Sequence, residues 1–150
     1  MNRLKGGMKL TKDLNNLEDG KYVIPVEAIK KDNDEPSAMA PFLDKNSLIT
    51  KQSNFLFIAL IIREEHVITG LQLKSEAGTW VEAKEKQTDQ ESNIRYEVFD
   101  IGTLHDVIEA RVQYEVKQNG QTFSGDEELR LKLDTTELRD VDSIDWNKLS

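Results

Sequence analysis

The sequence predicts an all-β fold, an antiparallel β-sandwich of about eight strands, on three observations. Apolar residues recur mainly at every second position, as strands with one buried face require. Turn residues separate these alternating segments at short spacing. No segment carries a convincing long helical pattern, and many short strands of this kind are typical of a sandwich.

The first part of the chain contains five predicted strands: 21–29, 47–50, 54–63, 67–74 and 79–84. In the first of them, Pro25 indicates a sheet edge or a bulge, because proline donates no hydrogen bond to a neighbouring strand. The third, NFLFIALIIR, is apolar on both faces, which is typical of a central strand.

Three more strands are predicted in the second part, at 94–101, 109–117 and 122–134. Asn119-Gly120 suits the positive-φ positions of a tight turn and joins the last two strands into a hairpin. Residues 85–93 (EKQTDQESN) have no apolar side chain, so we expect a flexible surface loop there.

Composition limits the possible functions. The 150 residues suffice for one domain, and the net charge of −8 disfavours nucleic acid and anionic membranes as partners. The chain has no cysteine, which excludes disulfides and thiolate metal sites. The longest apolar run, FLFIALII, suits a buried strand and not a membrane span. The start MNRLKGGMKL lacks the apolar region of a signal peptide, so the protein is either cytosolic or a domain whose export signals lie elsewhere.

Residues suited to catalysis are few. His66 and His105 lie far apart in polar turns, where surface positions are expected, and no serine sits in a G-x-S-x-G turn. Asp32 and Asp34 belong to a segment without the glycine and glutamate of an EF-hand loop. The sequence therefore indicates a binding module and not an enzyme.

The segment PSAMAPFL (36–43) is unusually apolar for a loop between the charged KKDNDE and the polar DKNS. Its Met39, Phe42 and Leu43 must bury against the core of the domain, a ligand or a partner.

Several segments, in this order, resemble the NEAT domain, the near-iron-transporter module of Gram-positive surface proteins. They are LEDGKYVIPVEAIK (17–30), PSAMAPFL, SLITKQSNFLFIALII (47–62), VITGLQLKSEAGTWVEAK (67–84) and YEVFDIGTLHDVIEARVQYEV (96–116). The resemblance covers about residues 14–134 and implies an immunoglobulin-like sandwich with a short 3-10 helix after the first strand. Residues 1–13 would then be an extension or an expression remnant. Residues 135–150 would be an acidic linker or a docked tail, with Trp146 as its large anchor.

The resemblance further implies a binding module in haem-iron acquisition at the bacterial cell surface or in secreted form. Haem would bind non-covalently in a groove between the 3-10 helix and the last hairpin; a host haemoprotein or other NEAT-type domains are the implied protein partners. Ser37 would hydrogen-bond a haem propionate or simply cap the helix. Met39 and Phe42 would lie over the porphyrin or act as apolar plugs.

The last strand departs from the family pattern. The family's Tyr-x-x-x-Tyr, in which the first tyrosine ligates the iron, falls here on Phe123 and Glu127. Phenylalanine cannot coordinate iron, and the nearest tyrosine is Tyr114 on the preceding strand. Met39, from the opposite side, is the candidate iron ligand. The alternative interpretation is therefore a NEAT-like domain that has lost haem binding and acts as a protein–protein interaction module.

Overall fold

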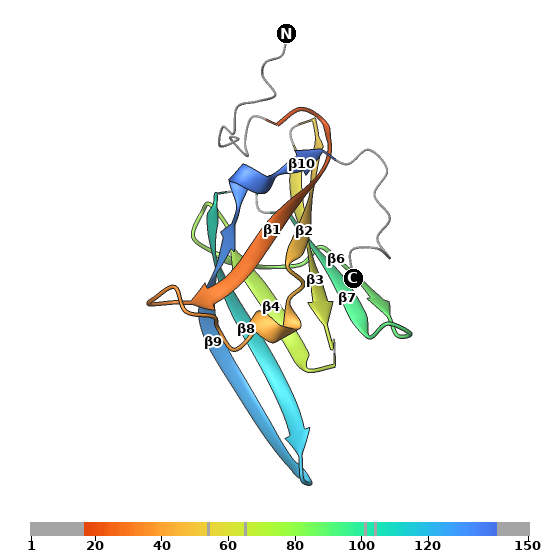
Figure 1. Ribbon diagram of the computed structural model, residues 1–150, viewed down its shortest axis with the longest axis vertical. Helices are drawn as coiled ribbons and strands as arrows, with labels where there is room; N and C mark the ends of the chain where they lie inside the picture. The colour runs from red at the N-terminus through yellow and green to blue at the C-terminus, as the bar shows by residue number, and fades with distance from the viewer. Residues whose placement is uncertain (1–16, 54, 65, 101, 104, 141–150) are drawn as a thin grey trace.

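The computed structural model describes residues 17–53, 55–64, 66–100, 102–103 and 105–140 (Figure 1). The expected extension 1–13 and the anchor Trp146 lie outside these residues. Two 3-10 helices are described, η1 (Ala40–Phe42) and η2 (Thr135–Glu137). The strands are β1 (Gly20–Lys30), β2 (Asn46–Gln52), β3 (Phe55–Arg63), β4 (Ile68–Lys74), β5 (Trp80–Glu82), β6 (Glu85–Asp89), β7 (Ile94–Asp100), β8 (Val107–Gln118), β9 (Gln121–Leu133) and β10 (Arg139–Asp140).

The strands form one antiparallel sheet that folds back on itself into two layers, in the order β5-β4-β8-β9-β1-β2-β3-β7-β6, with β10 also beside β1 (Figure 1). β1 belongs to both layers, because residues 20–25 pair with β2 and residues 26–30 pair with β9. This architecture confirms the predicted all-β sandwich, and η1 confirms the short 3-10 helix after the first strand.

Pro25 lies where β1 changes partners. It is the last residue of β1 in register with β2, opposite Asn46. The next amide, Val26 N, donates to Lys45 O at 2.8 Å, and Pro25 O accepts from Asp134 N at 3.0 Å. The missing N–H of proline therefore falls at the crossover between the two layers, where β1 is passing from one neighbouring strand to the next.

The main core lies between the layers and is built from one face of each of the strands β1–β4 and β7–β9. In β3 the even-numbered residues Leu56, Ile58, Leu60 and Ile62 are buried there, as the alternation of side chains along a strand requires. They pack with buried residues of the other strands, among them Ile24, Ile49, Leu71, Phe99 and Leu131. Each such side chain contributes about 1.5–3 kcal/mol of burial free energy.

Residues 85–93 differ from the sequence-based expectation, because residues 85–89 form the edge strand β6 instead of a loop. β6 pairs with β7 from Glu85↔Val98 to Asp89↔Ile94, and its side chains are almost all exposed. Main-chain hydrogen bonds hold this strand, so it needs no apolar alternation. Its charged side chains are typical of an edge that must not pair with another chain.

The hairpin β8–β9 is the longest feature of the fold and projects beyond the rest of the sandwich (Figure 1). Its register is unbroken from Val107↔Lys132 to Gln118↔Gln121. Asn119 and Gly120 adopt φ of 54° and 76°, which confirms the predicted tight turn.

Candidate functional site

One face of the projecting hairpin continues the core surface beyond the sandwich. At its base this face carries the buried Val112 and Leu129. Because side chains alternate along each strand and the register is unbroken, the same face continues towards the tip. There it carries Tyr114, Val116, Phe123, Gly125 and Glu127.

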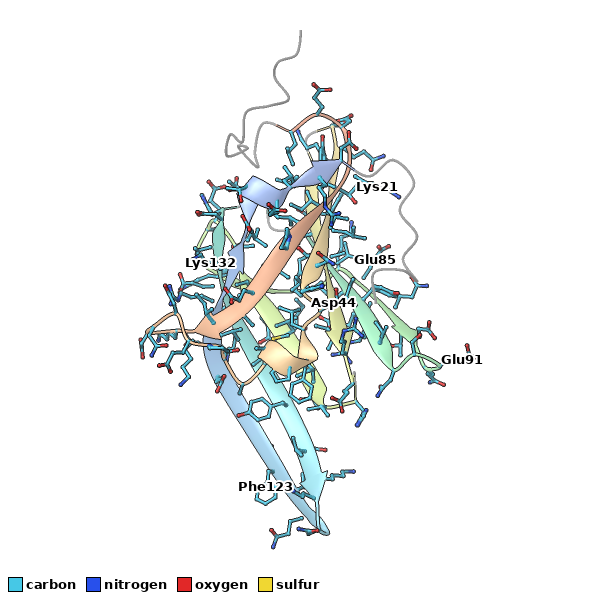
Figure 2. The ribbon with its side chains drawn as sticks, viewed as in Figure 1. Lys21, Asp44, Glu85, Glu91, Phe123 and Lys132 are labelled. Carbon is cyan, nitrogen blue, oxygen red and sulfur yellow. The ribbon has the colours of Figure 1, made fainter. Side chains whose placement is uncertain are left out.

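Burial falls along this face towards the tip. Tyr114 and Val116 are half-buried and pack against the edge of the main core. Phe123, directly opposite Val116, is 53% exposed, and Figure 2 shows it near the tip of the hairpin. A large aromatic side chain exposed beside other apolar groups is the kind of surface that a ligand or a partner covers.

The ring of Tyr114 lies across the opposite strand at Gly125. A Cβ atom at residue 125 would come within 2.7 Å of Tyr114 Cε2, and closer still to Cζ and Oη. Only glycine leaves room for this ring position. As a result the phenol oxygen of Tyr114, a residue of β8, lies over β9 between the positions of Phe123 and Glu127.

The opposite face of the hairpin is polar. Arg111 donates from Nε and Nη2 to the two carboxylate oxygens of Asp126, at 2.9 and 2.8 Å. Gln113 Nε2 donates to Asp126 Oδ1 at 3.2 Å. These hydrogen bonds from Arg111 and Gln113 lower the pKa of Asp126 to about 2. The two faces of the hairpin therefore differ sharply, and only the face shared with the core offers an apolar contact surface.

The second wall of the candidate site is residues 36–43, which include η1. η1 lies at the end of the sandwich from which the hairpin projects (Figure 1). Ser37 N donates to Ala28 O at 3.0 Å, and Phe42 N donates to Met39 O at 2.8 Å. Ser37 Oγ accepts from Met39 N at 3.1 Å, so this hydroxyl does stabilise the start of the turn.

The apolar residues of this segment divide between the core and its rim. Met39 is 2% exposed and Leu43 is 8% exposed, both within the main core. Phe42 is half-buried and packs against the edge of that core. The segment is therefore apolar because the domain's own core takes Met39 and Leu43, and Phe42 is left at the surface.

The structure brings the predicted site residues together in two groups. Tyr114, Phe123 and Glu127 share the core-facing side of the hairpin, and Ser37, Met39 and Phe42 belong to the η1 segment. Sequence analysis missed the pairing of Tyr114 with Gly125. Counting back from the two-residue turn at Asn119-Gly120 places these two residues opposite each other, so that signal was available.

Both histidines are exposed, as the sequence predicts. His66 has Nδ1 3.4 Å from Asn93 Oδ1 and lines a shallow pocket with Val116 at the edge of the candidate site. Among the described residues, no three His, Asp or Glu side chains are grouped as a metal site. Nor does the described part of the chain contain a helix long and apolar enough to cross a membrane.

A two-layered immunoglobulin-like β-sandwich with a 3-10 helix beside a projecting hairpin defines a class of small binding domains. The model of one such family, NEAT, described as the Iron Transport-associated domain, matches residues 15–136. The chain belongs to the NEAT family.

Individual relatives agree with this assignment. The chain is 28% identical over 119 residues to "Hemin/hemoglobin-binding protein 2" of Listeria monocytogenes. The aligned region covers 79% of this chain and 21% of that protein. The chain thus spans about a fifth of that relative. Among solved structures it resembles the NEAT5 domain of IsdX2, a B. anthracis hemophore, in complex with haem. The TM-score is 0.70 at 22% identity, over 80% of this chain and 99% of that one. A mutant of the same NEAT5 domain, also in complex with haem, gives a TM-score of 0.71 at 22% identity, over 81% and 99%. These structures support the same fold.

Proposed function

We propose that this domain is a binding module in bacterial haem-iron acquisition, located at the cell surface or secreted. It binds haem non-covalently between η1 and the core-facing side of the hairpin β8–β9. Family membership supports this function, as do a relative named for hemin and haemoglobin binding and two similar domains solved with haem. The observation that supports this position of the haem site on the domain is the exposed apolar face of the hairpin, with Phe123 at 53% exposure.

The core-facing side of the hairpin offers the apolar and aromatic surface that a porphyrin needs. Val116 and Phe123 lie opposite each other and offer an aliphatic and an aromatic surface outside the core. A porphyrin laid on them removes apolar area from water at about 25 cal/mol per Å² and stacks on the Phe123 ring. Phe42, half-buried at the edge of the core, contacts the other side.

Tyr114 is the iron ligand in this proposal. The family's ligating position holds Phe123, which has no donor atom. Tyr114 is the described tyrosine on the core-facing side of the hairpin, and its ring crosses Gly125 so that the phenol oxygen lies over β9. Met39 is the weaker candidate, because at 2% exposure its side chain must leave the core to reach a ligand. We therefore place Met39 beneath the site as a supporting core residue.

Two polar residues, Ser37 and Glu127, complete the proposed site. Ser37 Oγ accepts from Met39 N, and Ser37 is only 4% exposed, so the η1 segment has to shift before this hydroxyl can donate to a propionate. Glu127 lies on the face of the hairpin shared with Tyr114 and is half-buried. A carboxylate there would be the nearby base for the Tyr114 phenol proton if haem were bound. A host haemoprotein is the protein partner to test, because the Listeria relative is named for haemoglobin as well as hemin.

A haemin titration followed by the Soret absorbance tests the proposal. The wild-type domain should give a saturable one-to-one band shift, and Tyr114→Phe should lose the band of an oxygen ligand and bind at least about tenfold more weakly. Tyr22→Phe is the matched control, since the Tyr22 hydroxyl donates to Glu18 O in another part of the sandwich. No band shift beyond that of free haemin in the wild type would exclude haem binding. A protein-interaction role would then take its place.

A further inference from the structure

A second apolar cluster lies on the outer face of the sheet, away from the haem site. Val23, Leu48, Ala59 and Val98 come from β1, β2, β3 and β7. They are in register across the four strands, through the pairs Val23↔Leu48, Leu48↔Ala59 and Ala59↔Val98. Because their neighbours along each strand point into the main core, these residues form an apolar row on the opposite surface of the same layer. We call it the outer row.

The outer row is buried although no described element packs over it. Val23, Leu48 and Ala59 are 1%, 3% and 6% exposed. The principal contacts among the described elements are those between strands paired side by side and those of η1 and η2 with β1 or β3. A buried valine and leucine on the outer surface of a layer point to a further part of the chain as their cover.

The path of the chain indicates which part does so. β10 pairs with β1 through Val23↔Arg139 and Tyr22↔Asp140. The last described residue, Asp140, therefore lies one position along β1 from Val23, a member of the outer row. Residues 141–150 follow and read VDSIDWNKLS, with Ile144 and Trp146 two positions apart and thus on one side of an extended segment. Extended, they reach roughly 33 Å, whereas the four strands of the row span roughly 14 Å.

The N-terminal segment joins the described chain at Leu17, which is buried in the main core between the layers and not on its outer surface. It also contains no aromatic side chain, whereas Trp146 alone can cover a large part of the row.

We propose that residues 141–150 dock across the outer row, with Ile144 and Trp146 packed on Val23, Leu48, Ala59 and Val98. The segment then completes a second, smaller core on the outer surface of the layer and fixes the direction in which the chain leaves the domain. β10 and the projecting hairpin lie at opposite ends of the molecule (Figure 1), so this docking leaves the haem site free.

Tryptophan fluorescence of the full chain tests the proposal. The chain has two tryptophans, so Trp80→Phe leaves Trp146 as the only indole. Trp146 emission should lie at clearly shorter wavelength than in the unfolded chain and resist acrylamide quenching. In the same background, Leu48→Asp should shift the emission towards the unfolded position. Val107→Asp is the control, because Val107 is an exposed apolar residue on β8, away from the row. It should leave the emission unchanged. If Leu48→Asp does not fold, Leu48→Ala should give a smaller shift in the same direction.

A second measurement separates the possible occupants. Trp146→Ala should lower the Tm, and Leu10→Ala, in the N-terminal segment, should not. Trp146 emission at the unfolded position in the folded domain would overturn the proposal. So would a lower Tm for Leu10→Ala with none for Trp146→Ala, which would assign the row to the N-terminal segment. An emission shift that disappears on dilution would assign it to a second copy of the chain.

Discussion

The ring of Tyr114 on β8 lies directly over Gly125, its partner on β9, in space that a Cβ atom would fill. This pair holds a phenol oxygen above β9, the strand on which the sequence resemblance predicts Phe123 at the family's ligand position. The glycine is therefore a positioning residue for Tyr114, and its effect on haem can be separated from its effect on stability.

Gly125→Ala should push the Tyr114 ring off β9 and weaken haem binding by at least about tenfold, or about 1.4 kcal/mol. Alanine is a better strand residue than glycine, so the free energy of unfolding should fall by less than about 1 kcal/mol. Ser124→Ala is the control on the exposed opposite face of β9 and should leave haem affinity unchanged. Equal haem affinity for Gly125→Ala and wild type, by Soret titration, would argue against Tyr114 as the ligand.

Phe123→Tyr should strengthen haem binding, because it places a phenol at the ligand position of the family pattern. Phe55→Tyr is a close control, since Phe55 is 55% exposed against 53% for Phe123 but lies on β3. Both variants add one hydroxyl to an exposed ring, so any difference between their Soret titrations reports position. A Phe123→Tyr domain that binds haem no better than wild type would mean that residue 123 does not face the iron.

The double variant Phe123→Tyr/Tyr114→Phe tests whether the two phenols are alternatives. If Tyr114 ligates the iron in the wild type, the double variant should recover much of the affinity that Tyr114→Phe loses, with the Soret band of an oxygen ligand restored. Affinity in the double variant as low as in Tyr114→Phe would show that Phe123→Tyr cannot replace Tyr114, and that the site differs from the family arrangement.

Inside the sandwich, Arg95 Nε donates to Glu97 Oε2 at 2.7 Å, and Arg95 Nη2 donates to Ile68 O at 2.7 Å. Glu97 is fully buried, so Arg95→Ala should leave an uncompensated carboxylate in the core and destabilise the domain by about 3–5 kcal/mol. Arg111→Ala breaks the exposed pair with Asp126 and should cost much less, because water screens that pair. Urea unfolding of both variants measures the contrast. Similar losses for the two arginines would show that the buried pair contributes no more than a surface one.

The sequence predicts most of this fold because most strands have one buried face. The two-residue turn at Asn119-Gly120 even fixes the register that opposes Tyr114 to Gly125. The sequence pattern does not reveal β6, because its side chains are exposed and its stability comes from main-chain hydrogen bonds to β7. Nor does it show which apolar residues of PSAMAPFL enter the core. Both Met39 and Phe42 are large apolar residues of the same segment, so the sequence does not distinguish them. The path of the chain after Ser37 buries Met39 in the core and leaves Phe42 half-buried at its edge.

The ion pair on the polar face of the hairpin predicts how stability depends on pH. Hydrogen bonds from Arg111 and Gln113 lower the pKa of Asp126 to about 2, against about 3.9 for an unperturbed aspartate. A carboxyl with a lowered folded-state pKa stabilises the fold above its unfolded pKa and loses that contribution as the pH falls through its folded pKa. Wild type should therefore be more stable than Asp126→Asn at neutral pH, by a small amount because the pair is exposed. The difference should persist down to about pH 4 and vanish near pH 2, as urea titrations at several pH values can measure. A difference that is constant down to pH 2 would show that the Asp126 side chain acts through something other than its charge.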